Sequence, residues 1–178
     1  MQSFFIALLG IFLFVNSLQA QEKGFEVGFQ LSEYQQDFGL GIQITSPYLF
    51  KESIALRLRA NKQYLQHIDK KEVKEVWTPY LNLSLGVFGH RAKIHEKVAL
   101  YGEGGVIGLI PNDKFSDENF VFGGYGLFGF EFYFIDSFCY FIEAGGVGTG
   151  ATADQIPSEP IYCNGFLMNV GFRIIFNN

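Results

Sequence analysis

The sequence has little charge, and positive charge is the scarcer kind. Of its 178 residues, 17% are charged, and 13 Lys and Arg stand against 18 Asp and Glu, which gives a net charge of -5. Proteins that bind nucleic acid concentrate positive charge on one face. The charge balance therefore excludes nucleic acid as a partner.

The sequence also lacks an apolar run long enough to cross a bilayer as a helix. The run from Phe4 to Val15 falls short of the roughly 20 residues that a spanning helix needs. Polar residues and the small residue Ala20 follow it, which is how a secretory signal peptide ends. We expect a signal peptide over residues 1–20 and one exported domain over residues 21–178. A membrane anchor is the alternative for the first segment.

Cysteine is scarce as well, since Cys139 and Cys163 are the only two. If the last two segments of the chain pair as a hairpin, the two thiols lie about 30 Å apart at about 3.4 Å per residue. A disulfide needs Cα atoms within about 7 Å of each other. We therefore expect two free thiols, even in an oxidising compartment where a bridge is permitted.

Phenylalanine and glycine are abundant, with 21 of each, and they are placed in alternation with other residues. In FVFGGYGLFGFEFYF, Phe120 to Phe134, six phenylalanines share one parity, and small or polar residues and Glu131 share the other. Successive side chains of a strand point to opposite faces, so this stretch predicts a strand with one apolar face. Eight segments alternate in this way, and no helical period of comparable length competes with them. They are Gly24–Ser32, Asp37–Ser46, Glu52–Lys62, Glu75–Phe88, Lys97–Leu109, Phe120–Phe134, Phe138–Gly150 and Ile161–Phe176.

Two barrel architectures fit eight alternating strands, and they assign the two faces oppositely. A soluble lipocalin-like barrel turns its apolar face inward around a ligand, whereas a transmembrane barrel turns it to lipid. A water-facing surface should be rich in Lys, yet the lysines fall in loops or at the ends of the expected strands. The aromatic residues gather near both ends of the strands, as they do at the two boundaries of a membrane. The pattern favours an all-β, eight-stranded antiparallel up-and-down transmembrane β-barrel.

The chain resembles the small eight-stranded outer-membrane barrels of Gram-negative bacteria, which include the outer membrane protein A transmembrane domain and outer membrane protein X. The resemblance covers the whole mature chain and lies in the signal peptide, the eight strands and the alternating loop lengths. The final GFLMNVGFRIIFNN is similar to the signal that the barrel assembly machinery reads, except that Asn177 and Asn178 follow Phe176. The resemblance implies the cell outer membrane, contacts with its lipid, and no site residues. It names no surface partner.

No catalytic, cofactor or metal site is predicted from the motifs. Gly124, Gly126 and Gly129 match a dinucleotide fingerprint, but no helix follows to present its N-terminus. The pair His90 and His95 has only Glu96 beside it, which is too little for a metal site. A lipid-modifying barrel enzyme is an alternative function, with His67, Asp69, Ser116 and Asp117 as the side chains that could supply its acid–base chemistry.

Six charged residues on the polar face form the candidate site. Counted from the short-turn end of each strand, these residues lie in one layer. In a narrow barrel their charges are buried, and burying a charge costs free energy unless an opposite charge pairs with it. We therefore expect an interior ion-pair network that closes the lumen, with Arg173 nearest Glu143 or Glu26. Its members are Arg57, Arg59, Glu103, Glu131, Glu143 and Arg173.

These features predict a non-enzymatic integral outer-membrane protein with a structural or surface-contact role. Eight strands leave an interior just wide enough for side chains, so solute passage is not expected. The longer loops, residues 63–74, 111–119 and 151–160, are expected to face the exterior.

Overall fold

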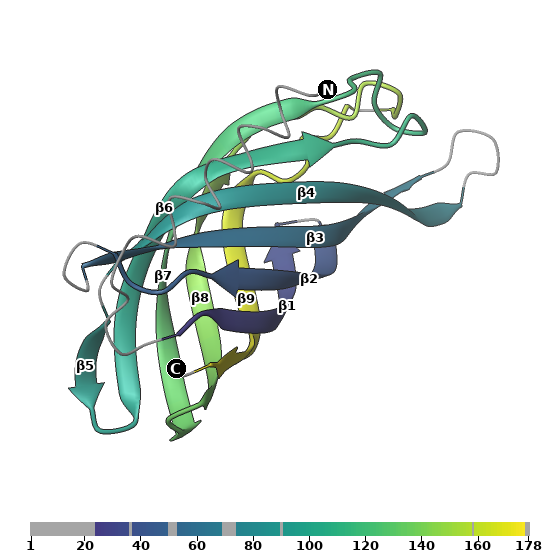
Figure 1. Ribbon diagram of the computed structural model, residues 1–178. Helices are drawn as coiled ribbons and strands as arrows, with labels where there is room; N and C mark the ends of the chain where they lie inside the picture. Colours follow the sequence, from purple (N-terminus) through teal and green to yellow (C-terminus); the bar gives the residue numbers. More distant parts are fainter. Residues whose placement is uncertain are drawn as a thin grey trace.

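A computed structural model describes residues 24–35, 37–49, 53–68, 74–89, 91–157 and 159–176. The signal peptide predicted over residues 1–20 lies outside this part of the chain. Among the described residues, no helix is long and apolar enough to cross a membrane. The same residues form nine strands (Figure 1): β1 (Glu26–Tyr34), β2 (Asp37–Thr45), β3 (Ile54–Ile68), β4 (Glu75–Gly89), β5 (Ala92–His95), β6 (Val98–Ile110), β7 (Val121–Ile135), β8 (Phe138–Gly148) and β9 (Gly165–Ile175).

Eight long strands close into an antiparallel barrel. They pair in the order β4-β3-β2-β1-β9-β8-β7-β6, and β4 also pairs with β6, which completes the ring. The short β5 adds to one end of β6. The predicted all-β, eight-stranded up-and-down barrel is confirmed.

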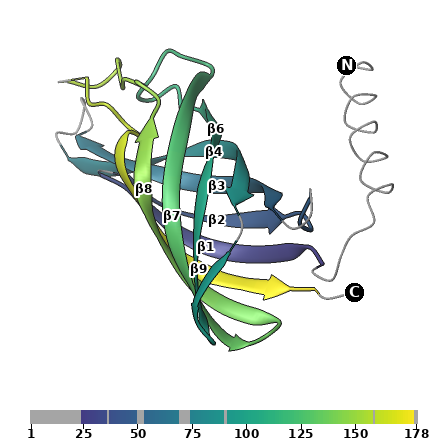
Figure 2. The same ribbon diagram turned by 90° about the vertical axis from the view of Figure 1, so that its left-hand side faces the viewer.

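The longer connections lie together at one end of the barrel. Residues 111–120 meet residues 149–157 and 159–164 there, whereas the two-residue turn between β7 and β8 lies at the opposite end (Figure 2). We call these the long-loop end and the short-turn end. The predicted loop from residue 63 to 74 begins later, because β3 continues to Ile68 and pairs with β4 as far as Glu75. The polar Gln63 and Gln66 obscured this extension, but the alternation of burial runs through them.

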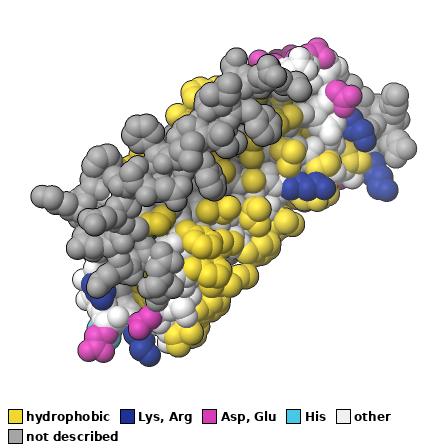
Figure 3. Space-filling model, viewed as in Figure 1, with side chains coloured by type: hydrophobic (Ala, Val, Ile, Leu, Met, Phe, Trp, Pro, Cys, Tyr) yellow, Lys and Arg dark blue, Asp and Glu magenta, His cyan; other side chains and the backbone are white. Residues whose placement is uncertain are grey.

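The two faces of the sheet differ in polarity. Ile42 and Leu83 point outward and are 57% and 47% exposed, whereas Gln43 and Asn82, their neighbours in sequence, point inward and are 1% and 0% exposed. Figure 3 shows the outward hydrophobic side chains as a broad band between the ends of the molecule. This distribution does not fit a lipocalin-like barrel, because the interior holds many buried polar and charged side chains beside its apolar ones, and the outside is apolar.

Two residues of the predicted strands lie elsewhere than expected. Lys62, expected at a strand end, lies within β3 on the outward face between Leu40 and Leu81. Tyr162, expected on the outward face, is 1% exposed, because β9 begins only at Gly165 and the preceding segment turns its ring onto the barrel mouth.

Candidate functional site in the barrel lumen

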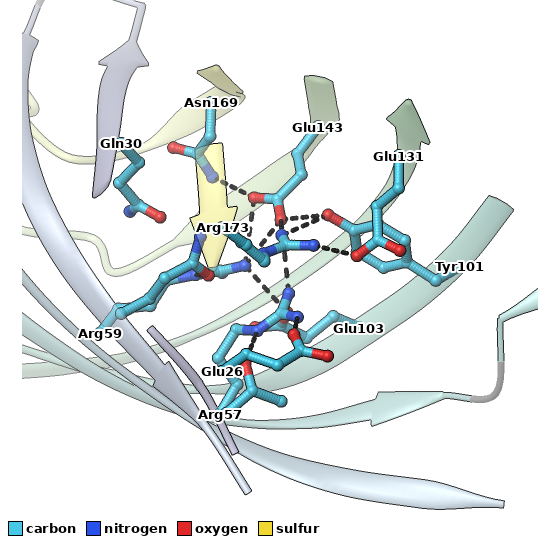
Figure 4. A network of polar contacts seen from close by, with 12 residues as sticks. Glu26, Gln30, Arg57, Arg59, Tyr101, Glu103, Glu131, Glu143, Asn169 and Arg173 are labelled. Carbon is cyan, nitrogen blue, oxygen red and sulfur yellow. Dashed lines mark hydrogen bonds and ion pairs between the residues drawn. The ribbon is translucent and has the colours of Figure 1, made fainter. Parts of the chain in front are cut away.

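Eight charged side chains fill the lumen towards its short-turn end. They are four arginines and four glutamates: Arg57, Arg59, Arg91, Arg173, Glu26, Glu103, Glu131 and Glu143. All are buried. Alternation brings seven of them to one interior from six strands, and Arg91 joins them from the connection between β4 and β5. Most of them are seen in Figure 4. Equal numbers of cations and anions allow each charge to be compensated where water is excluded.

Arg57 and Arg59 project inward together from β3, because they are two positions apart on one strand. The Arg57 Nη1 and the Arg59 Nη2 each donate to Glu103 Oε2 at 2.8 Å. The Arg59 Nη2 also donates to both Glu143 oxygens, at 3.0 and 3.1 Å. The Arg57 guanidinium lies 4.0 Å from the centroid of the Phe88 ring, so an apolar side chain covers the part of it that carboxylates leave free.

Arg173 joins two carboxylates from neighbouring strands. Its guanidinium donates to Glu131 and, over 2.6 Å, to Glu143 Oε1. The Tyr101 hydroxyl accepts from the same guanidinium at 2.6 Å and donates to Glu143 at 2.5 Å. Of the two partners expected for Arg173, Glu143 is in contact. Among the described residues, no ion pair joins Arg173 to Glu26.

Arg91 is the member that sequence reasoning missed. It lies between β4 and β5, outside the segments predicted to be strands, yet it is 6% exposed. Its guanidinium donates to Glu26 at 2.6 Å and to Glu131 at 2.5 Å. Burial acts to lower the pKa of Arg91, but these two carboxylates outweigh it and raise the pKa well above its usual value. Four inward glutamates against three inward arginines were the signal that a further cation was needed.

A polar layer lies above the charged one. The Gln30 amide donates to Asn61 at 2.7 Å, and the Asn61 amide donates to Asn82 at 2.6 Å. The Asn82 amide continues to the Tyr34 hydroxyl at 3.3 Å. Asn61 and Asn82 lie opposite each other on the paired strands β3 and β4. The other two hydrogen bonds join β1 to β3 and to β4, with which β1 does not pair, so they cross the lumen.

The long-loop end is covered by an aromatic cluster, which we call the cap. Phe115 and Tyr162 come from the two long loops, and each contacts Tyr80 of β4 edge to face, with ring centroids 6.0 and 5.3 Å away. The loops are held together by the Gln155 N–H, which donates to the Phe115 carbonyl at 3.0 Å. Burial raises the pKa of Tyr162 to about 12. Side chains thus occupy the lumen at three levels.

The two cysteines lie at different ends of the molecule, and both are free and buried. The Cys163 N–H donates to Asp37 at 2.6 Å beneath the cap. Burial raises the pKa of the Cys163 thiol well above its usual value, and the charge of Asp37 adds to the increase. The thiol is therefore protonated at neutral pH and a poor nucleophile.

Among the described residues, the side chains considered for catalysis or metal binding make no hydrogen bond or ion pair with one another. His67 Nε2 lies 2.8 Å from the Thr78 hydroxyl, and the Ser116 hydroxyl donates to the Thr152 carbonyl at 3.4 Å. Asp69 and His90 lie outside the described residues. Within those residues there is no group of three side chains able to hold a metal ion. Gly124, Gly126 and Gly129 lie inside β7, where no helix follows them.

No family model matches the chain, and no curated protein matches it by sequence. Among solved structures, the N-terminal β-barrel domain of Pseudomonas aeruginosa OprF is similar, with 14% identity, a TM-score of 0.58, and 88% of this chain and 100% of that one covered. The outer membrane protein Ail of Yersinia pestis, in a phospholipid nanodisc, is 12% identical with a TM-score of 0.50 over the same shares. This chain therefore has the fold of the small eight-stranded outer-membrane β-barrels.

Proposed function

We propose that this chain is an integral outer-membrane protein whose barrel is a non-enzymatic anchor with a closed lumen, serving envelope structure or surface contact. The observation that carries the proposal is the distribution of polarity across the barrel wall. Large apolar side chains cover the outside, and a charge-balanced set of ion pairs fills the inside. Only a barrel with lipid around it and little water within it benefits from both.

The outward face supports membrane insertion. Leu58, Leu83 and Phe128 are about half exposed at mid-strand positions. Contiguous apolar surface on this scale is rare on soluble monomers, because contact with water is unfavourable. In a bilayer the same side chains contact acyl chains. Ail, which has a similar fold, is an outer membrane protein, and this supports the same location.

Membrane fractionation tests the location. In a Gram-negative host, the full chain should sediment with the outer membrane, resist extraction by alkali or urea, and dissolve only in detergent. Release into the soluble fraction as a folded protein would contradict membrane insertion.

Conductance tests whether the lumen is closed, and lipid analysis tests whether the protein is an enzyme. The purified protein in a planar bilayer should give no large steady conductance, because ion pairs and the cap fill the lumen. A lipid A mass spectrum should be the same from cells with and without the protein. A steady ion current would refute the closed lumen, and a change in lipid A mass would favour an enzyme.

A further inference from the structure

Lys62 is the single cationic side chain that β1–β4 and β6–β9 turn outward. The outward positions of these fully described strands are otherwise apolar or uncharged, apart from Glu33 and Glu75 near the long-loop end. Arg57 and Arg59, on the same strand, face the lumen. A cation on the apolar face is costly unless its head reaches a polar layer, so its depth and direction decide what it contacts.

The position of Lys62 along β3 places it near the boundary of the apolar band. It follows Ile54 by eight residues, a rise of about 21 Å at 3.4 Å per residue and a strand tilt of roughly 40°, in a band about 25 Å tall. Leu40 and Leu81 pair with it on the two neighbouring strands. Taking Ile54, the first residue of β3, as the opposite edge of the band places Lys62 just below the level at which headgroups begin.

The side chain of Lys62 is directed towards that boundary. Its Nζ lies 5.6 Å from the centroid of the Tyr64 ring, the next outward residue towards the long-loop end. Gln66 is the next outward residue of β3 after Tyr64, and it pairs with Trp77 of β4. The Trp77 side chain is 52% exposed. Long cationic side chains at a membrane boundary extend in this way, with the stem on apolar surface and the head in the polar layer.

The Lys62 ammonium has no anionic partner within the described protein. The ion pairs among the described residues all lie in the lumen, and none includes Lys62. The phosphates of anionic lipids occupy the layer that this ammonium faces, and they attract basic residues held at that depth.

We propose that Lys62 binds the phosphate of an anionic lipid in the leaflet at the long-loop end, with Tyr64 beside the headgroup and Leu40 and Leu81 against the acyl chains. This site rests on the proposed membrane insertion of the barrel. It adds to that function a preferred lipid, held at one position on the perimeter.

Lipid retention tests the site. The folded chain is placed in nanodiscs of phosphatidylcholine with a minority of phosphatidylglycerol, and the lipids that remain bound after transfer to detergent are counted by native mass spectrometry. The wild type should retain phosphatidylglycerol, and Lys62→Met should weaken this retention about fivefold, the factor expected for one basic residue near anionic headgroups. Lys62→Arg should keep it.

Lys114→Met is the matched control, because Lys114 is exposed at the same end but lies in a loop. It should retain phosphatidylglycerol like the wild type. Equal retention by Lys62→Met and the wild type would overturn the proposal, and so would an equal loss in Lys114→Met. Competition by inorganic phosphate would assign the site to free phosphate instead. Failure of the wild type to enter nanodiscs would refute membrane insertion itself, which separates the two failures.

Discussion

At the scale of single residues, the lumen arginines depend on one another through shared carboxylates. Glu143 contacts both Arg59 and Arg173, and Glu131 contacts both Arg91 and Arg173. Removing one partner leaves the other charge buried, which costs more than removing a pair. The stabilisation therefore belongs to the network and not to any one ion pair.

We predict a strong coupling between Arg173 and Glu143. Arg173→Met should lower the free energy of unfolding by about 3 to 5 kcal/mol, and adding Glu143→Gln should cost less than the sum of the single changes by about 1 to 3 kcal/mol. Reversible urea unfolding from lipid vesicles measures each corner of the cycle. Lys114→Met with Glu143→Gln is the control and should be additive; additivity in the Arg173 cycle would mean that the two groups do not interact.

At the scale of strands, glycines on the two faces of the barrel have different roles. A Cβ at Gly41, which faces the lumen, would collide with the Asn61 side chain and come within 2.6 Å of the Ala60 carbonyl oxygen. A Cβ at Gly104, which faces outward, would meet nothing closer than the Tyr125 carbonyl at 3.7 Å. The first glycine makes room for the hydrogen bonds that cross the lumen, and the second does not.

Gly41→Ala should therefore destabilise the barrel by about 1 to 3 kcal/mol, as expected for an overpacked interior. Gly104→Ala should be neutral or stabilise it by up to about 1 kcal/mol, since Gly in a strand is entropically costly. Urea unfolding of the two variants from the same vesicles provides the comparison. Similar losses at both positions would show that the outward surface is also tightly packed.

The cap makes the reactivity of Cys163 depend on Phe115. Phe115→Ala should weaken the cap by about 3 kcal/mol and so speed alkylation of Cys163 by on the order of a hundredfold. The rate is measured by mass spectrometry of the folded protein in detergent at mildly alkaline pH. Phe122→Ala, which changes a ring that is 63% exposed, is the control and should leave the rate unchanged. The same rate in all three proteins would mean that the cap does not cover Cys163.

Alternation predicted the strands well and their ends poorly. Within strands, apolar and polar residues see different surroundings, so the inward positions of Arg57, Glu103 and Glu143 follow from sequence. At the ends this contrast disappears: the last six residues of β3 and the burial of Tyr162 depend on pairing with β4 and on loop contacts. Arg91 was missed for the same reason, because it lies in a connection, where side-chain direction has no period.

At the scale of the whole molecule, the two ends of the barrel should face different compartments. In outer-membrane barrels the longer loops are extracellular and the short turns periplasmic. Asp113 lies in a long loop and Glu96 in the turn between β5 and β6, and both are exposed.

We predict that Asp113→Cys is labelled in intact cells by a maleimide polymer too large to cross the outer membrane. Glu96→Cys should be labelled only after that membrane is permeabilised. The native cysteines are buried, and the unsubstituted protein measures their background. Labelling of Glu96→Cys in sealed cells would reverse the orientation.

The central claim is that lipid surrounds this barrel and that side chains fill it. The most direct test is the transfer of magnetisation from lipid acyl protons to the backbone amides and methyl groups of β4 in nanodiscs. We predict a period of two, with strong transfer to Leu81, Leu83, Leu85 and Val87 and little to Asn82, Ser84 and Phe88. Transfer to the second group, or no lipid contact along β4, would contradict the account.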